Sequence, residues 1–214
     1  MKSKIKKALI FTGIIMLLAA AALCVFNIIQ DKQAYEKSQD ILNELKLQIP
    51  EPTEESSGDM PENPADDLFL PYEDTAKEIP APISVDGNDY SGYLSLPSLG
   101  LELPVADICS YDALNESPCR YSGNAETSDL IIAAHNFSSH FGRIADLNID
   151  DEILYINSSG NTYRYRVNDI TVLGGNDTEG MFFGKSSEWD ITLFTCTLSG
   201  QKRVAVRGCL TDEK

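Results

Sequence analysis

The longest apolar stretch of the chain lies near its N-terminus, where no charged residue occurs between Ala8 and Gln30. A helix needs about 20 apolar residues to cross the hydrocarbon core of a bilayer. A cleaved signal peptide is the alternative, with a shorter apolar part of about 7–15 residues and a small-residue cleavage site, which Ala19 to Ala22 would supply. Because the apolar run continues to Ile29, we expect an uncleaved signal anchor over residues 8–30.

Two segments follow the anchor before any strand pattern begins. Residues 31–48 place apolar side chains among charged ones and predict a short helical stalk. Residues 51–78 hold ten acidic residues against one basic residue, and such a composition buries too little apolar surface to offset chain entropy. We therefore predict that residues 31–82 are a stalk followed by an acidic, proline-rich linker. Residues 68–72 form an apolar patch in this linker, and we hypothesise that the patch docks over a cleft of the folded domain.

From residue 83 to 214 the apolar residues fall into short runs bounded by glycine, proline and polar turns. The expected strands cover residues 90–96, 101–105, 129–135, 152–158, 162–173, 191–198 and 203–206. Short strands at intervals of roughly 8–12 residues are typical of a β-barrel or sandwich. A short helix is expected within residues 140–147. The pattern therefore predicts one all-β domain at residues 83–214.

The charge distribution predicts how the chain is oriented across the membrane. Residues 1–7 carry four lysines, and the remaining 13 basic residues face 33 acidic ones, a net charge of −20 beyond the anchor. A basic flank marks the cytoplasmic side of an anchor. We therefore predict a cytoplasmic head at residues 1–7 and a single-pass cell-membrane protein whose domain is extracytoplasmic. We expect no nucleic-acid partner, because phosphates demand a basic surface.

The last two predicted strands suggest a chemical site. If Ser199-Gly200 is the turn between them, cross-strand partners sum to 399 and Cys196 faces Arg203. A neighbouring guanidinium stabilises a thiolate, which is the nucleophilic form of cysteine. Arg207 shares this face but lies about 13 Å further along the strand, so Arg203 is the better partner.

The remaining candidate residues are histidines and cysteines. His135 ends an apolar strand and suits proton transfer, whereas His140 is expected at the surface or behind the site. Cys109 and Cys119 flank a short loop, and the spacing is compatible with a disulfide or with two thiols. No Cys-x-x-Cys or His-x-x-x-His spacing points to zinc. A thiolate, an imidazole and a guanidinium together favour acyl transfer at a peptide carbonyl.

Three motifs resemble the sortases. They are Thr192-Leu-Phe-Thr-Cys196-Thr with the following Lys-Arg203-Val-Ala-Val-Arg-Gly208, Leu130-Ile-Ile-Ala-Ala-His135, and Tyr90-Ser-Gly-Tyr-Leu-Ser-Leu-Pro-Ser-Leu-Gly100. The resemblance covers about residues 88–210. It implies a closed eight-stranded β-barrel and a cysteine transpeptidase of the Gram-positive cell surface. It also implies cleavage of an LPxTG-type sorting signal and transfer to an amine acceptor, either a peptidoglycan precursor or a pilin lysine.

The resemblance also assigns roles to residues. Cys196 would form the thioacyl intermediate, His135 would act as general acid and then as base, and Arg203 would position substrate and stabilise the oxyanion. Candidates for substrate binding are Thr195, Ala134 and Leu193. No cofactor is implied; some members bind calcium, which the many acidic residues would permit, but no ligand set is visible.

Departures from the family pattern bear on the subclass. Ala134 stands where the family often has glycine before the histidine. The short loop at residues 174–190 argues against class B, and the lack of a second anchor argues against the pilus-building class C, so we expect a class A- or D-like member.

Other reaction classes fit less well. A papain-like hydrolase places cysteine before histidine, and the caspase signature is absent. The competing hypothesis is a non-catalytic or purely hydrolytic surface barrel that binds peptides.

Overall fold

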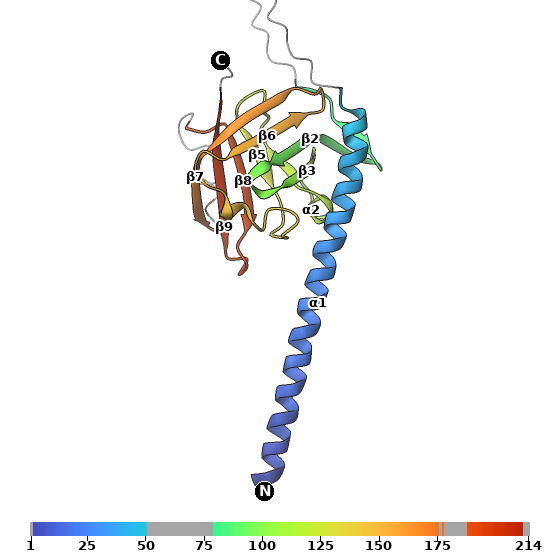
Figure 1. Ribbon diagram of the computed structural model, residues 1–214, viewed down its shortest axis with the longest axis vertical. Coiled ribbons are helices and arrows are strands. Elements are labelled where there is room, and N and C mark those ends of the chain that lie inside the picture. Colours follow the sequence, from blue (N-terminus) through green and yellow to red (C-terminus); the bar gives the residue numbers. More distant parts are fainter. Residues whose placement is uncertain (1, 51–78, 176, 178–187, 212–214) are drawn as a thin grey trace, which may run out of the picture.

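The computed structural model describes residues 2–50, 79–175, 177 and 188–211. Helix α1, Lys2–Gln48, is continuous, and its N-terminal half projects away from the rest of the molecule (Figure 1). By length and composition it is a candidate membrane span. The hypothesised docking of residues 68–72, and most of the loop at 174–188, lie outside the described residues.

The strands of the described residues form one closed barrel. They are β1 (Ile83–Val85), β2 (Asn88–Leu96), β3 (Leu101–Ala106), β4 (Cys119–Ser122), β5 (Leu130–Ala133), β6 (Glu152–Asn157), β7 (Thr162–Gly174), β8 (Ile191–Cys196) and β9 (Lys202–Leu210). Their order is β1-β2-β3-β4-β5-β8-β9-β7-β6, and a second pairing of β2 with β6 closes a ring of eight. β1 extends the sheet outside this ring, beside residues 88–90. The predicted closed eight-stranded barrel is confirmed.

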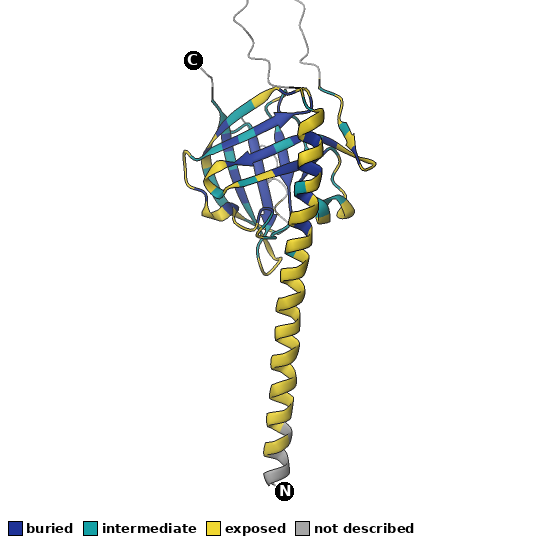
Figure 2. Cartoon of the chain, turned by 45° about the vertical axis from the view of Figure 1, so that its right-hand side comes forward, coloured by how far each residue is buried: buried dark blue, intermediate teal, exposed yellow. Residues whose placement is uncertain are grey.

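Alternation along the strands separates two apolar clusters. Residues such as Leu130, Leu193 and Val206 fill the barrel interior. Their neighbours Ile131 and Phe194 point to the opposite face, because successive side chains of a strand alternate. An apolar cluster on the outer face of the barrel is stable only when another element shields it from water. Figure 2 shows the C-terminal half of α1 lying against the barrel wall.

The docked half of α1 differs from the predicted stalk. Its buried side chains recur at helical spacing and form one stripe: Ala34, Ser38, Ile41, Leu42 and Leu45. Ile41 and Leu45 belong to the outer cluster of the barrel. Lys46 adds an ion pair with Glu102 on β3 at 2.6 Å. Residues 31–48 are therefore helical, as predicted, but they are part of the folded domain's packing.

Three short elements were missing from the sequence-based prediction: β1, β4 and helix α2, Tyr111–Glu116. The helix expected within residues 140–147 is only a 3₁₀ turn, η3, Ile144–Asp146; a second 3₁₀ turn, η2, spans Pro97–Leu99. Seven strands lie where the pattern predicted them, with ends shifted by a few residues. The strands that carry the two site motifs were therefore predictable from the sequence, β5 as a continuous apolar run and the β8–β9 hairpin from its strand and turn pattern.

Candidate active site

The β8–β9 hairpin has the predicted register. Cys196 pairs with Arg203, and Thr195 pairs with Val204. The connection is wider than a two-residue turn: the Thr197 amide donates to the Lys202 carbonyl at 3.0 Å, so residues 198–201 form the loop. Because the 197–202 pair is hydrogen-bonded, the adjacent 196–203 pair is the non-hydrogen-bonded kind, in which side chains lie closest.

β5 brings the histidine to the other side of Cys196. β5 and β8 run parallel with Ala133 opposite Phe194, and continuing this register by two residues sets His135 beside Cys196. One bond supports the continuation beyond the strand: the Ala134 amide donates to the Phe194 carbonyl at 3.2 Å. Neighbouring strands lie about 4.8 Å apart. With the register extended in this way, His135 lies two residues beyond the end of β5 and in one row with Cys196 of β8 and Arg203 of β9, on the outer face of the barrel.

The surroundings of His135 are aromatic. Tyr111 meets its ring edge-on with centroids 6.1 Å apart, and Phe137 is tilted against it at 5.3 Å. The imidazole is half-buried, and this burial lowers its pKa below the ordinary value by disfavouring the charged form. The guanidinium of Arg203 donates to the carbonyls of Gly200 and Lys202, both at 3.1 Å. In this conformation Arg203 therefore engages the turn.

A cavity of about 420 Å³ opens beside Cys196. Its wall comes from the β8–β9 hairpin on one side and from the loop after His135 on the other. The lining residues are Asn136, Phe141, Gly142, Ile144, Ala145, Thr195, Cys196, Thr197, Leu198, Ser199 and Val204. The thiol at its wall gives the cavity a nucleophile.

The three predicted substrate-binding residues have different places. Thr195 lines the cavity, and its hydroxyl donates to the Ala134 carbonyl at 2.8 Å. Ala134 is buried and contributes this carbonyl, not its side chain, to the site region. Leu193 is fully buried in the barrel interior, because it lies two residues further from the strand end. We therefore leave Leu193 out of the proposed site.

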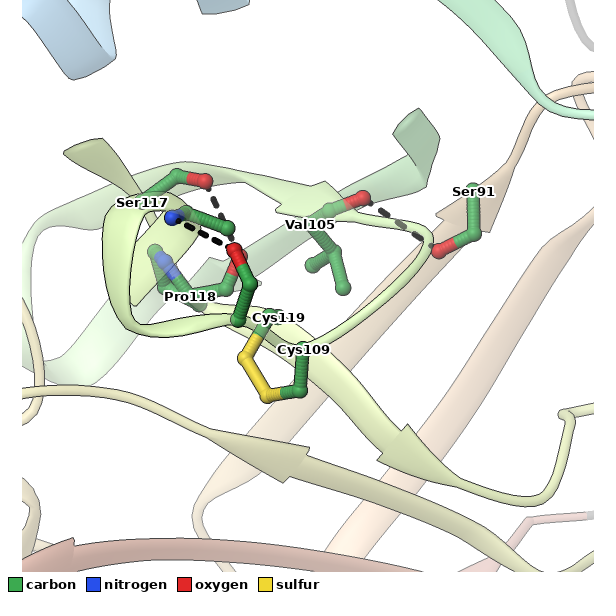
Figure 3. Close-up of a disulfide and its surroundings, with 8 residues drawn as sticks. Ser91, Val105, Cys109, Ser117, Pro118 and Cys119 are labelled. Atoms are coloured by element: carbon green, nitrogen blue, oxygen red, sulfur yellow. Dashed lines mark hydrogen bonds between the residues drawn. A yellow bond between two sulfur atoms is a disulfide. The ribbon is translucent and has the colours of Figure 1, made fainter. Parts of the chain in front are cut away.

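A disulfide holds the segment that carries Tyr111. Cys109 and Cys119 are bonded, which decides between the two readings of their spacing (Figure 3). The bridge closes the loop that contains α2, and a side-chain cap from Ser110 to the Ala113 amide at 3.1 Å begins the helix. Figure 3 also shows the Ser117 hydroxyl donating to the Pro118 carbonyl beside the bridge. The disulfide thus restrains α2 next to His135.

His140 is not at the surface. Its side chain is fully buried, and neither ring nitrogen has a hydrogen-bond partner among the described residues. Desolvation, followed by the nearby charge of His135, lowers its pKa to about 4. Its ring lies 5.6 Å from that of Phe137, which also contacts His135. A neutral His140 therefore supports the His135 loop from within.

The described residues contain no group of three or more metal-ligating side chains.

A family model described as a sortase domain matches residues 94–211. The chain belongs to the sortase family. A search of the curated proteins finds no match.

Solved sortase structures share this fold. Sortase C from Clostridium perfringens SM101 is 25% identical, with a TM-score of 0.50, over 58% of this chain and 71% of that one. A Clostridium perfringens sortase C with the C-terminal cell wall sorting motif is 23% identical, with a TM-score of 0.52, over 64% and 75%. A Clostridium perfringens sortase D5 transpeptidase is 23% identical, with a TM-score of 0.51, over 63% and 83%.

These neighbours do not fix the subclass of this sortase. Most of those above carry class C titles, the class that the sequence argued against, and one carries a class D title. At such identities the matches establish the fold. As a member of this family the chain is a sortase-type cysteine transpeptidase.

Proposed function

We propose that this sortase cleaves an LPxTG-type sorting signal through a thioacyl-enzyme on Cys196 and passes the acyl group to an amine acceptor. The acceptor would be a peptidoglycan precursor or a pilin lysine. The observation that carries the proposal is the row in which Cys196 lies between His135 and Arg203. Of these three residues, Cys196 alone lines the cavity. The anchor would hold the domain on the outer side of the cell membrane.

The chemistry follows from the three groups. The Cys196 thiolate attacks the scissile carbonyl carbon, and the carbonyl electron pair moves onto oxygen, where the Arg203 guanidinium stabilises it. When the tetrahedral intermediate collapses, the C–N bond breaks and the imidazolium of His135 gives its proton to the departing amine. The neutral imidazole then takes a proton from the incoming amine, whose attack on the thioester releases the Cys196 thiolate.

Three features of the site affect these steps. Burial makes His135 less basic, so its protonated form is a stronger acid toward the leaving amine. Arg203 engages two turn carbonyls, and a rotation of its long, half-exposed side chain must release these bonds before it reaches the oxyanion. Thr195 fixes the Ala134 carbonyl next to the site, which keeps β5 and β8 aligned at the position of the row.

The test incubates the full chain, in nanodiscs, with a panel of LPxTG-type peptides and an amine acceptor, and measures the joined product by mass spectrometry. Cys196→Ala should abolish the product. Cys209→Ala is the matched control, because Cys209 is also a half-buried thiol without a disulfide, and it should retain the parent rate. Product formed by Cys196→Ala would refute the assignment, and cleavage with water as the sole acceptor would favour the hydrolytic alternative.

A further inference from the structure

The end of the barrel that carries the site lies beside the half of α1 that holds the candidate membrane span. The apolar run of residues 8–30 is about 33 Å long as a helix, close to the roughly 30 Å of a hydrocarbon core. Asp31 is the first charged residue after this run, and its carboxylate accepts bonds from the Ser139 amide at 3.0 Å and hydroxyl at 2.5 Å. Ser139 lies in the loop that follows His135. The loop is therefore tied to α1 at the membrane boundary.

The opposite end of the barrel faces away from the membrane. At the other end of the docked helix, Pro50 lies so close to Gly160 that a Cβ there would be 2.5 Å from the Pro50 carbonyl oxygen. Gly160 is in the β6–β7 turn, far along the barrel from Ser139. Residues 31–50 thus run from one end of the barrel to the other, over about 30 Å. The barrel has a membrane-proximal end and a distal end, and the row of His135, Cys196 and Arg203 is at the proximal one.

The β8–β9 hairpin projects from this proximal end in the direction in which the N-terminal half of α1 extends (Figure 1). Its tip residue, Leu198, is exposed over 98% of its surface. Leu198 shares the cavity wall with Asn136 and Gly142, which bracket Ser139 in the tethered loop. The tip therefore lies at the level of the membrane boundary and presents an apolar side chain there.

The charge next to the tip differs from that of the domain as a whole. Beyond the anchor the chain has a net charge of −20, yet the hairpin between residues 196 and 203 contains no acidic residue and carries Lys202 and Arg203. Lys202 is exposed. An exposed apolar residue with basic residues on the same hairpin is a combination that favours binding to an anionic lipid surface.

We infer that the tip of the β8–β9 hairpin, with Leu198 at its apex and Lys202 beside it, docks into the headgroup layer of the membrane that anchors this chain. The docking rests on α1 and the hairpin, and it does not depend on the proposed reaction. It places the mouth of the Cys196 cavity at the bilayer surface. A substrate segment that emerges from the same membrane would then reach the Cys196 thiol after only a few residues of its chain have left the lipid.

The test measures lipid contact by tryptophan quenching in the full chain, reconstituted in vesicles that contain anionic lipid with brominated acyl chains. Trp189 is the sole native tryptophan and precedes β8 at the distal end, so the parent emission provides the baseline. The tryptophan added by Leu198→Trp should lose at least half of its emission. The one added by Ser159→Trp, at an exposed position of the distal β6–β7 turn, should keep its emission within a tenth.

A second variant tests the contribution of charge. Combining Leu198→Trp with Lys202→Glu should halve the quenching in anionic vesicles and leave it unchanged in zwitterionic ones. Equal, weak quenching at positions 198 and 159 would overturn the docking. If quenching at position 198 is the same in anionic and zwitterionic vesicles and is unchanged by Lys202→Glu, docking through Leu198 is supported and the role of the basic residue is overturned.

Discussion

Acidification should destabilise the fold through His140. Its imidazole is fully buried, with no hydrogen-bond partner for either nitrogen among the residues that the structure describes. Its pKa is about 4 in the folded chain, against about 6.5 in the unfolded chain. Between these values the unfolded chain binds more protons, so stability rises with pH in this window and is lost as the pH falls through it. The full difference corresponds to about 3 kcal/mol, of which about 2 kcal/mol should be lost by pH 5.

The substitution His140→Phe isolates this contribution. Phenylalanine keeps an aromatic ring beside Phe137, and no hydrogen bond to any residue in the described part of the chain is lost. Urea unfolding of the full chain in detergent, followed by Trp189 fluorescence, gives the free energy of unfolding at each pH. When the pH is lowered from 7.5 to 5, the free energy of unfolding of the parent should fall by about 2 kcal/mol more than that of the variant. Curves that fall in parallel would refute the burial argument, since the carboxylates titrate in both proteins.

Three further predictions concern activity and packing. Arg203→Lys should lower kcat about 100-fold in the peptide-transfer assay with little change in KM, because oxyanion stabilisation acts in the transition state; an unchanged kcat would contradict the role. Replacing Cys109 and Cys119 together by alanine should lower the free energy of unfolding in urea by about 3 kcal/mol, the closure entropy of a loop of this length; no loss would contradict it. Leu45→Ala should cost about 2–5 kcal/mol in the same measurement, while Leu47→Ala, at an 87% exposed position, should cost none; equal effects would argue against the docked α1.

Much of the barrel was predictable because alternation is a strong local signal. The register of the β8–β9 hairpin follows from strand pattern and turn residues, and Cys196 does pair with Arg203. The place of His135 at the end of a buried run was also readable, because β5 is apolar at every position. To place His135, Cys196 and Arg203 in one row, the parallel pairing of β5 with β8 is also needed. Neither strand's own sequence predicts that pairing.

Other features depended on contacts between distant segments. The docking of α1 was missed because the stripe through Ser38, Ile41 and Leu45 is set among charges, and the partner face of the barrel exists only after folding. β4 has four residues, with a single pair to β3, and has no alternation long enough to detect. His140 was expected either at the surface or behind the site, and the sequence could not decide between these positions; the structure buries it in the loop tied to Asp31.

The most direct test of the central claim is the mass of the enzyme after brief mixing with a peptide substrate and acid quench. The claim predicts an increase equal to the acyl portion of the peptide, located on Cys196 by digestion. It should be lost in Cys196→Ala and discharged by an added amine. An adduct on Cys209, or transfer of the peptide without any adduct on Cys196, would contradict the account.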